Sequence, residues 1–177
     1  RFMDILTIGL GTIGTTYSYL FNKAGHNVEH YIRKSSKKIN ITELNVDMLD
    51  GRNNKKGEHY TDTYKVNTHT KDNYDFIFIS MPAGNIESVI ETLNSNNIKG
   101  TIMLCCGIWE DKKYLEKIMQ GREYILGYPV AGGNIVDATL TCCVFDHFIL
   151  EKKENSKIDN YDKLVELFGS CNIKLET

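Results

Sequence analysis

The chain lacks the features that mark several large classes of protein. None of its apolar runs approaches the ~20 residues that a membrane span requires, and its first apolar run is short and enters a glycine turn, unlike the core of a signal peptide. Neither sign of charge dominates, because 21 Lys and Arg face 23 Asp and Glu for a net charge of -2. This balance argues against a general binder of nucleic acid or membrane surfaces. We therefore expect a cytoplasmic protein with neither kind of partner.

The cysteines and histidines do not form a recognisable metal or disulfide pattern. There is no C-x-x-C, and the one H-x-x-x-H pair, His26 and His30, falls at a predicted strand rather than on a helix, so we predict no metal site. The odd count of five cysteines, with two adjacent pairs, is typical of reduced, buried thiols: Cys105, Cys106, Cys142, Cys143 and Cys171. Cys106 could act as a nucleophile, but no histidine stands near it in the sequence to activate it, which favours a packing role.

A glycine motif close to the N-terminus is the most informative feature that is present. A short apolar run over residues 5–8 leads into G-x-G-x-x-G, and helical spacing of apolar residues follows as far as residue 24. In this setting the first glycine permits a tight turn, the second lets the backbone approach a pyrophosphate, and the third lets helix and strand pack closely. The phosphates then lie at a helix N-terminus, which favours anions. The sequence thus predicts a dinucleotide site at Gly9, Leu10, Gly11, Thr12, Ile13 and Gly14.

Strands and helices alternate along most of the chain. Buried strands are predicted over residues 4–9, 27–32, 74–80 and 101–106, and helices over residues 13–24, from 86 to about 93, over 110–119 and over 161–168. This alternation predicts an α/β fold, Rossmann-like and doubly wound, with a largely parallel sheet. Because no linker or repeat interrupts it, we expect residues 1–177 to form a single NAD(P)-binding domain.

Other segments give weaker signals. Residues 33–60 are polar and read as a loop with short irregular strands, and residues 60–70 as one or two strands. Residues 128–133 read as a loop, in which Gly132 and Gly133 either let the backbone approach a ligand or make a plain tight turn. Residues 140–145 and 148–152 are predicted to be two strands around a turn at residues 146–147. With a last strand over residues 172–176, they would give the sheet an antiparallel C-terminal edge.

The end of the second predicted strand indicates which nucleotide is bound. NAD-binding folds place an Asp or Glu there, to bond the ribose 2′-hydroxyl. In this chain Arg33 stands at that point, 24 residues after Gly9, and Lys34 follows it. A guanidinium can hold a 2′-phosphate through two hydrogen bonds, so the pattern favours NADP(H) over NAD(H). The alternative is that this basic run is only a solvated loop.

The order of these pieces resembles the N-terminal NADP-binding domain of the 2-dehydropantoate 2-reductase (ketopantoate reductase) family. The pieces that carry the resemblance are the glycine motif, Gly25-His26-Asn27-Val28 before Arg33, Tyr74-Asp75, Ser80-Met81-Pro82-Ala83, a glycine turn at Gly107, and Gly132-Gly133. They cover nearly the whole chain. In open α/β sheets ligands lie beyond the carboxyl ends of the strands. We therefore expect Pro82 and Ala83, with the adjacent Met81, to line the cofactor, and the resemblance implies that the position of Cys106 faces it as well.

The resemblance implies an NADPH-dependent oxidoreductase that transfers hydride to a small 2-oxo acid, as in the formation of pantoate for coenzyme A. In that family a helical C-terminal substrate domain supplies the lysine that polarises the carbonyl, and this domain is absent from the chain. The resemblance therefore assigns no catalytic residue here, and we expect the chain alone to be inactive. An apolar patch left exposed without that domain would allow a homodimer.

Two positions depart from the family pattern. Pro82 stands where the family often has a lysine, and Cys106 stands where it tends to have an asparagine. Both changes favour a substrate other than ketopantoate, and they keep two alternatives open: an opine-type or other 2-hydroxy-acid dehydrogenase, and a non-catalytic nucleotide-sensing module. Trp109, beside the glycine turn, either walls the nicotinamide pocket or anchors the core.

Overall fold

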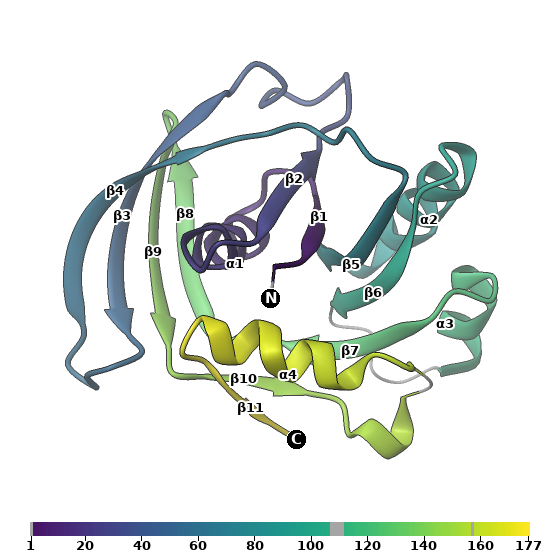
Figure 1. The fold of residues 1–177 in the computed structure, drawn as a ribbon. Helices are drawn as coiled ribbons and strands as arrows, with labels where there is room; N and C mark the ends of the chain where they lie inside the picture. The colour runs from purple at the N-terminus through teal and green to yellow at the C-terminus, as the bar shows by residue number, and fades with distance from the viewer. Residues whose placement is uncertain (1, 107–111, 157) are drawn as a thin grey trace.

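The computed structural model describes residues 2–106, 112–156 and 158–177. Two sheets and four α-helices are seen among them (Figure 1). The larger sheet has seven strands in the order β11-β10-β7-β6-β5-β1-β2. Its strands are β1 (Asp4–Ile8), β2 (Asn27–Tyr31), β5 (Asn73–Ser80), β6 (Lys99–Cys105), β7 (Tyr124–Tyr128), β10 (His147–Leu150) and β11 (Lys174–Glu176).

The larger sheet is parallel from β2 through β7. Strand β10 runs antiparallel to β7, and β11 is parallel to β10, so the C-terminal edge is antiparallel to the rest of the sheet. These observations confirm the predicted Rossmann-like α/β fold with an antiparallel C-terminal edge. The sheet was predicted because its central strands are buried on both faces and therefore read as nearly continuous apolar runs.

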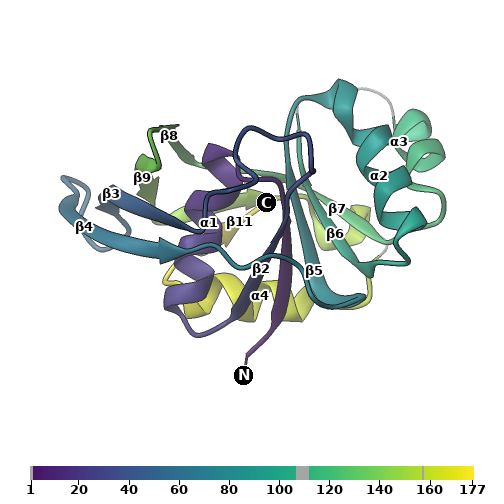
Figure 2. The same ribbon diagram turned by 90° about the horizontal axis from the view of Figure 1, so that it is seen from above.

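Helices cover both faces of this sheet (Figure 2). Helices α2 (Ile86–Ser95) and α3 (Lys112–Met119) lie on one face, and α1 (Thr12–Lys23) and α4 (Tyr161–Ser170) on the other. Alternate strand residues divide between two cores: Leu6 and Ile77 pack toward α2 and α3, whereas Ile5 and Phe78 pack toward α1 and α4. Among the described residues, no helix has the length and apolar character needed to cross a membrane.

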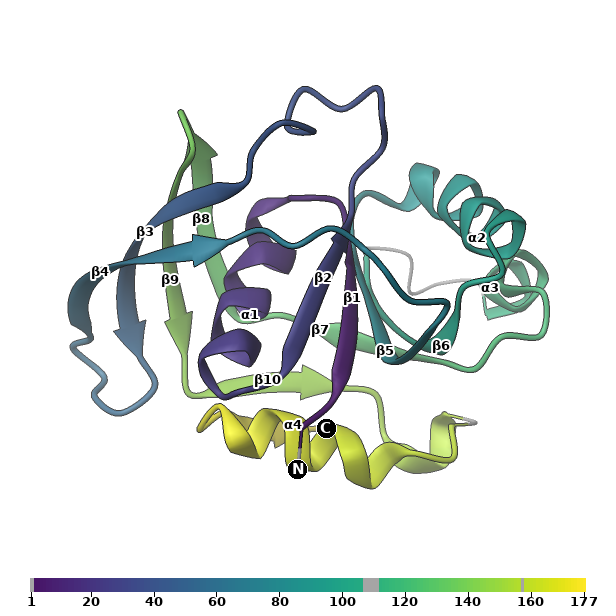
Figure 3. The ribbon, with the colours of Figure 1, turned by 45° about the horizontal axis from the view of Figure 1, so that its top comes forward.

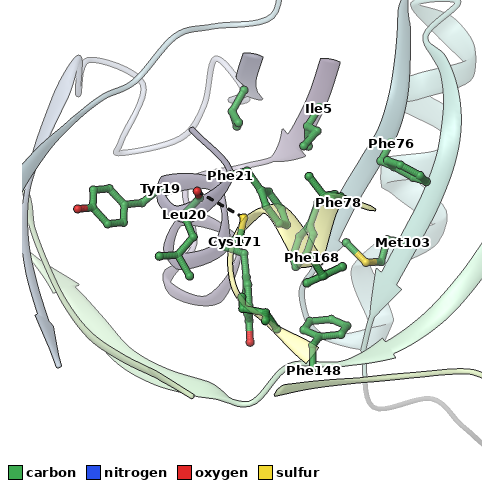
Figure 4. Close-up of a cluster of buried hydrophobic side chains, with 14 of the residues drawn as sticks. Ile5, Tyr19, Leu20, Phe21, Phe76, Phe78, Met103, Phe148, Phe168 and Cys171 are labelled. Atoms are coloured by element: carbon green, nitrogen blue, oxygen red, sulfur yellow. Dashed lines mark hydrogen bonds between the residues drawn. The ribbon is translucent and has the colours of Figure 1, made fainter. Parts of the chain in front are cut away.

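The core under α1 and α4 is rich in aromatic rings (Figure 4). Tyr17 of α1 contacts Phe78 of β5, Phe148 of β10 and Phe168 of α4, with ring centroids 5.2 to 6.3 Å apart. Phe148 and Phe168 lie 4.6 Å apart. These contacts join the first helix of the chain to its last helix, so the two ends of the sequence share one core.

A second, four-stranded sheet in the order β4-β3-β9-β8 curves around α1 (Figure 1). Its strands are β3 (Glu43–Gly51), β4 (Glu58–Lys65), β8 (Ala131–Val136) and β9 (Thr139–Phe145). One face buries apolar residues in the same core as Tyr17: Leu44, Val46, Met48, Leu140, Cys142 and Val144. The remaining short elements are the 3-10 turns η1 (Ala83–Asn85) and η2 (Lys153–Asn155).

The prediction of a loop with short irregular strands over residues 33–60 is wrong, because β3 is a regular strand of nine residues. Its burial alternates strictly, and it is hydrogen-bonded on both sides, antiparallel to β4 and parallel to β9. The alternation was obscured in the sequence because Asn45 and Asp47 occupy outward positions, Leu49 is an exposed apolar residue, and polar loops flank the strand.

Two predictions in the C-terminal third are also wrong. Strands β9 and β10 do not pair as a hairpin, because β9 belongs to the small sheet and β10 to the large one. Residues 128–133 are not all loop, since β8 begins at Ala131. Gly132 and Gly133 therefore lie in a strand rather than in a tight turn. A Cβ at Gly133, whose φ is +149°, would fall 2.0 Å from the Thr141 carbonyl oxygen, so the close approach of β9 requires glycine there.

Candidate functional site

The glycine motif forms the turn between β1 and α1, as predicted. Gly9 has a φ of +78°, which L side chains rarely adopt, and its N–H donates to the Tyr31 carbonyl of β2 at 2.7 Å. Gly11 is the N-cap of α1, with no side chain capping the helix and no acidic residue in its first turn. The N–H groups at this helix end therefore face a region without a competing carboxylate, which favours an anion.

The space around the three glycines differs in the way the motif predicts. A Cβ built on Gly9 or on Gly11 would meet nothing within 4 Å, whereas one on Gly14 would lie 3.1 Å from Cγ2 of Thr7. The first two glycines thus border open space, and the third is a site of close contact between helix and strand. Open backbone at a helix N-terminus fits a pyrophosphate, so the residues present are compatible with a dinucleotide.

A pocket of about 270 Å³ lies beside this turn, at the carboxyl ends of β1 and β2 and against α2. The lining combines backbone of the glycine turn, two cations and the polar and apolar side chains of one face of α2. Its residues are Ile8, Gly9, Leu10, Gly11, Tyr31, Ile32, Arg33, Ser36, Lys38, Met81, Asn85, Ser88, Val89, Thr92 and Leu93. The loop between β2 and β3, which carries both cations, arches beyond these strand ends (Figure 3).

The two cations in the pocket lining are Arg33 and Lys38. Arg33 follows the end of β2 and is exposed. Lys38 donates from Nζ to the carbonyl oxygen of Leu10 at 2.8 Å, and so it joins the β2–β3 loop to the glycine turn. Lys38 was missed in the sequence, although it belongs to the same basic run as Arg33, because the run gives no sign of where the loop folds back.

Five of the residues predicted to contact a cofactor line this pocket: Gly9, Leu10, Gly11, Arg33 and Met81. The others lie near it in the fold but outside its lining. Thr12, Ile13 and Gly14 form the first turn of α1, Lys34 is exposed in the following loop, Pro82 is exposed, Ala83 begins η1, and Cys106 is buried just after β6. Gly107 and Trp109 are outside the described residues.

Three polar residues of α2 were missed: Asn85 at its N-cap, and Ser88 and Thr92 on the helix. The apolar stripe of α2 correctly predicted the helix, and its buried members Ile86, Ile90 and Leu93 pack against the sheet. The polar residues between them carried no signal, because serine and threonine on a helix usually face water. Only the position of α2 beside β1 brings them to the pocket.

Comparison with known proteins places this fold in a family. Residues 5–134, which include the glycine turn and the pocket, match the family model described as Ketopantoate reductase PanE/ApbA. No curated protein sequence matches the chain.

Solved structures of the same fold include several reductases. A PanE/ApbA family ketopantoate reductase from Ralstonia eutropha is 14% identical with a TM-score of 0.72, over 99% of this chain and 56% of that one. A dimeric ketopantoate reductase from Staphylococcus aureus is 13% identical with a TM-score of 0.65, over 97% and 54%. A D-mandelate dehydrogenase, solved with NADH and anilino(oxo)acetate, is 14% identical with a TM-score of 0.69, over 98% and 56%.

The chain therefore spans little more than half the length of these solved structures. At such low identity the likeness to each of them shows the fold. The family model covers most of the chain, including the β1–α1 turn and the Arg33 position. On this evidence the chain belongs to the ketopantoate reductase PanE/ApbA family.

Proposed function

We propose that this chain is the NADPH-binding part of an oxidoreductase that reduces a small 2-oxo acid. The observation that carries the proposal is the pocket at the end of β1 and β2, where open glycine backbone and the cations Arg33 and Lys38 meet. A bound NADPH would supply the hydride that converts the 2-oxo acid to a 2-hydroxy acid.

Different residues of the pocket would bind different parts of the cofactor. Gly9 and Gly11 leave room for the pyrophosphate against the N-terminus of α1. The exposed Arg33 guanidinium offers paired donors to a ribose 2′-phosphate, and Lys38 adds a second positive charge at the same edge. The absence of Asp or Glu directly after β2 leaves a ribose 2′-hydroxyl without its usual acceptor, which favours NADPH over NADH.

The reactive end of the cofactor would face the edge formed by the carboxyl ends of β5 and β6. Ser80 and Cys105, the last residues of these parallel strands, are register partners, and Met81, Pro82 and Cys106 follow them directly. We infer that these residues, with Ala83, border the nicotinamide. Pro82 and Cys106 replace a cation and an amide donor of the family pattern, which favours a substrate other than ketopantoate.

A second candidate is a 2-hydroxy-acid dehydrogenase that uses NADH. The fold shared with D-mandelate dehydrogenase favours it, because that structure contains NADH and an oxo acid. The two candidates predict opposite preferences between NADPH and NADH.

Enzymatic turnover tests whether the residues of this chain are sufficient for an active site. We expect no oxidation of NADPH with ketopantoate, because the family resemblance places the carbonyl-polarising lysine in a helical domain outside this chain. The measurement is the loss of NADPH absorbance with ketopantoate and with a panel of other 2-oxo acids. Steady turnover by this chain would show that its own residues complete the active site.

We also propose that the chain forms a homodimer. The Staphylococcus aureus reductase of the same fold is dimeric, and this chain exposes large apolar side chains on the small sheet, namely Leu49, Val136 and Phe145. Sedimentation equilibrium would give a mass of twice the chain if this is correct, and the mass of one chain if it is not.

A further inference from the structure

A buried histidine lies directly beneath the first glycine of the turn. His30, in β2, is completely buried and contacts two polar groups. Its Nδ1 lies 2.8 Å from the carbonyl oxygen of Gly9, and its Nε2 lies 2.6 Å from the hydroxyl of Tyr64. Tyr64 belongs to β4 and is buried as well, so this contact joins the small sheet to the glycine turn.

The chemistry of the three groups determines where the protons are. A carbonyl oxygen only accepts hydrogen bonds, so Nδ1 of His30 must carry the proton and donate it to Gly9. In a neutral imidazole Nε2 is then an acceptor, and the Tyr64 hydroxyl donates to it. Burial lowers the pKa of His30 to about 4, which keeps the ring neutral near pH 7. The pair therefore forms a relay with one direction: Tyr64 to His30 to the Gly9 carbonyl.

The far end of the same turn is held by Ser18, which also interacts with Tyr64. The Ser18 hydroxyl donates to the Gly14 carbonyl at 2.7 Å, and Thr7 lies 2.6 Å from that hydroxyl. Gly9 has no side chain of its own, and its φ of +78° lies outside the usual range. Its conformation is thus held by its N–H bond to Tyr31 and by the bond from His30 to its carbonyl.

We propose that His30 and Tyr64 are positioning residues, which hold the Gly9 peptide in the orientation that keeps the turn open for a nucleotide phosphate. The proposal rests on the proposed function in one respect, namely that a nucleotide binds at this turn. Without the His30 donor, the Gly9 carbonyl loses its side-chain partner and the peptide rotates to find another. The small sheet acts on nucleotide binding through Tyr64.

The test compares four variants by hydrogen exchange without nucleotide and by NADPH affinity. In His30→Leu the donor is lost, and we expect the Gly9 amide to exchange faster and NADPH to bind more weakly, each by about tenfold or more. His30→Asn replaces the ring with an amide whose N–H₂ stands near the position of Nδ1, and it should recover most of both effects. Tyr64→Phe keeps the ring and should give an intermediate loss.

His26→Leu is the matched control, because His26 is also a buried histidine, placed just before β2 and away from the turn. It accepts from the Met3 N–H through Nδ1 at 3.0 Å and pairs with Ser170 through Nε2. Its replacement should speed exchange of the Met3 amide and leave the Gly9 amide and NADPH affinity close to those of the unchanged chain. Equal effects of His26→Leu and His30→Leu on NADPH binding and on the Gly9 amide would reduce His30 to a residue of general stability and overturn the proposal.

If His30→Leu fails to fold, one further measurement tests the proposed role of His30. The ¹⁵N chemical shifts of His30 in the unchanged chain at pH 7 should show a proton on Nδ1 and none on Nε2, whereas the reverse tautomer would overturn the relay. If the unchanged chain does not bind NADPH, the proposed function fails, and the exchange of the Gly9 amide still decides the role of His30.

Discussion

At the scale of single residues, the first two glycines of the motif are required for different reasons. Gly9 needs its left-handed φ of +78°, whereas Gly11 has an ordinary extended backbone, with φ −83° and ψ 164°. Both border open space. The motif predicted their position from the sequence, and the structure adds that, of these two glycines, only Gly9 is required by the fold itself.

Arg33 could be predicted from its place after a strand, but Lys38 could not, because its contact with Leu10 depends on how a loop of polar residues closes.

Replacement of Gly11 by alanine therefore separates binding from folding. We expect Gly11→Ala to change the free energy of unfolding by less than about 1 kcal/mol, because its backbone suits alanine and its Cβ meets no atom within 4 Å. The methyl group would occupy the space proposed for the pyrophosphate, so NADPH binding should fall below detection. Urea unfolding and a calorimetric titration measure the two effects. Full NADPH affinity in this variant would place the phosphates elsewhere.

The buried histidine makes stability depend on pH. The pKa of His30 is lowered to about 4 by burial, against about 6.5 in an unfolded chain. Between these values the unfolded state binds the extra proton, so the stability that neutral His30 gives is complete above pH 6.5 and is lost as the pH falls to 4. We expect a loss of about 3 kcal/mol over this range. Urea midpoints measured from pH 7 to pH 4 should fall less steeply for His30→Asn than for the unchanged chain.

At the scale of elements, the central strands and helices were predictable and the small sheet was not. Strands β5 and β6 each contain an unbroken apolar run, over residues 76–79 and 102–105, because helices cover both of their faces. Strand β3 buries Leu44, Val46 and Met48 toward α1, and a nine-residue alternation with Asn45 and Asp47 in outward positions resembles a polar loop. The pairing of β3 with β9 joins residues almost a hundred positions apart, which no local pattern reveals.

The two faces of β3 should respond differently to the same substitution. Leu44 is completely buried toward α1, whereas Leu49 is 46% exposed on the other face. We expect Leu44→Ala to lower the free energy of unfolding by about 2–5 kcal/mol through the cavity that it leaves, and Leu49→Ala by less than about 1 kcal/mol. Urea unfolding of the two variants makes the comparison. Equal effects would contradict the packing of the small sheet on α1.

At the scale of the whole molecule, α1 joins the parts. Its N-terminus forms the glycine turn, one side contacts β1 and β5, and the other side packs on β8 and β9. The aromatic cluster of Tyr17, Phe78, Phe148 and Phe168 continues this core to the C-terminal helix. Both sheets thus meet on one helix. That residues 1–177 form a single NAD(P)-binding domain stays a prediction. The sequence predicted the strands and helices that carry these rings, but their meeting depends on chain reversals that its local patterns do not contain.

The central claim of this account is that Arg33 recognises a 2′-phosphate, and four affinities test it most directly. NADPH and NADH differ only by that phosphate, so each is titrated against the unchanged chain and against Arg33→Ala, with Lys37→Ala as a control for loss of charge in the same loop outside the pocket lining. We predict that Arg33→Ala weakens NADPH binding by about tenfold or more and changes NADH binding by less than about threefold. In Lys37→Ala, the affinity for either nucleotide should change by less than about threefold. Equal losses for NADPH and NADH, or a preference of the unchanged chain for NADH, would contradict the claim.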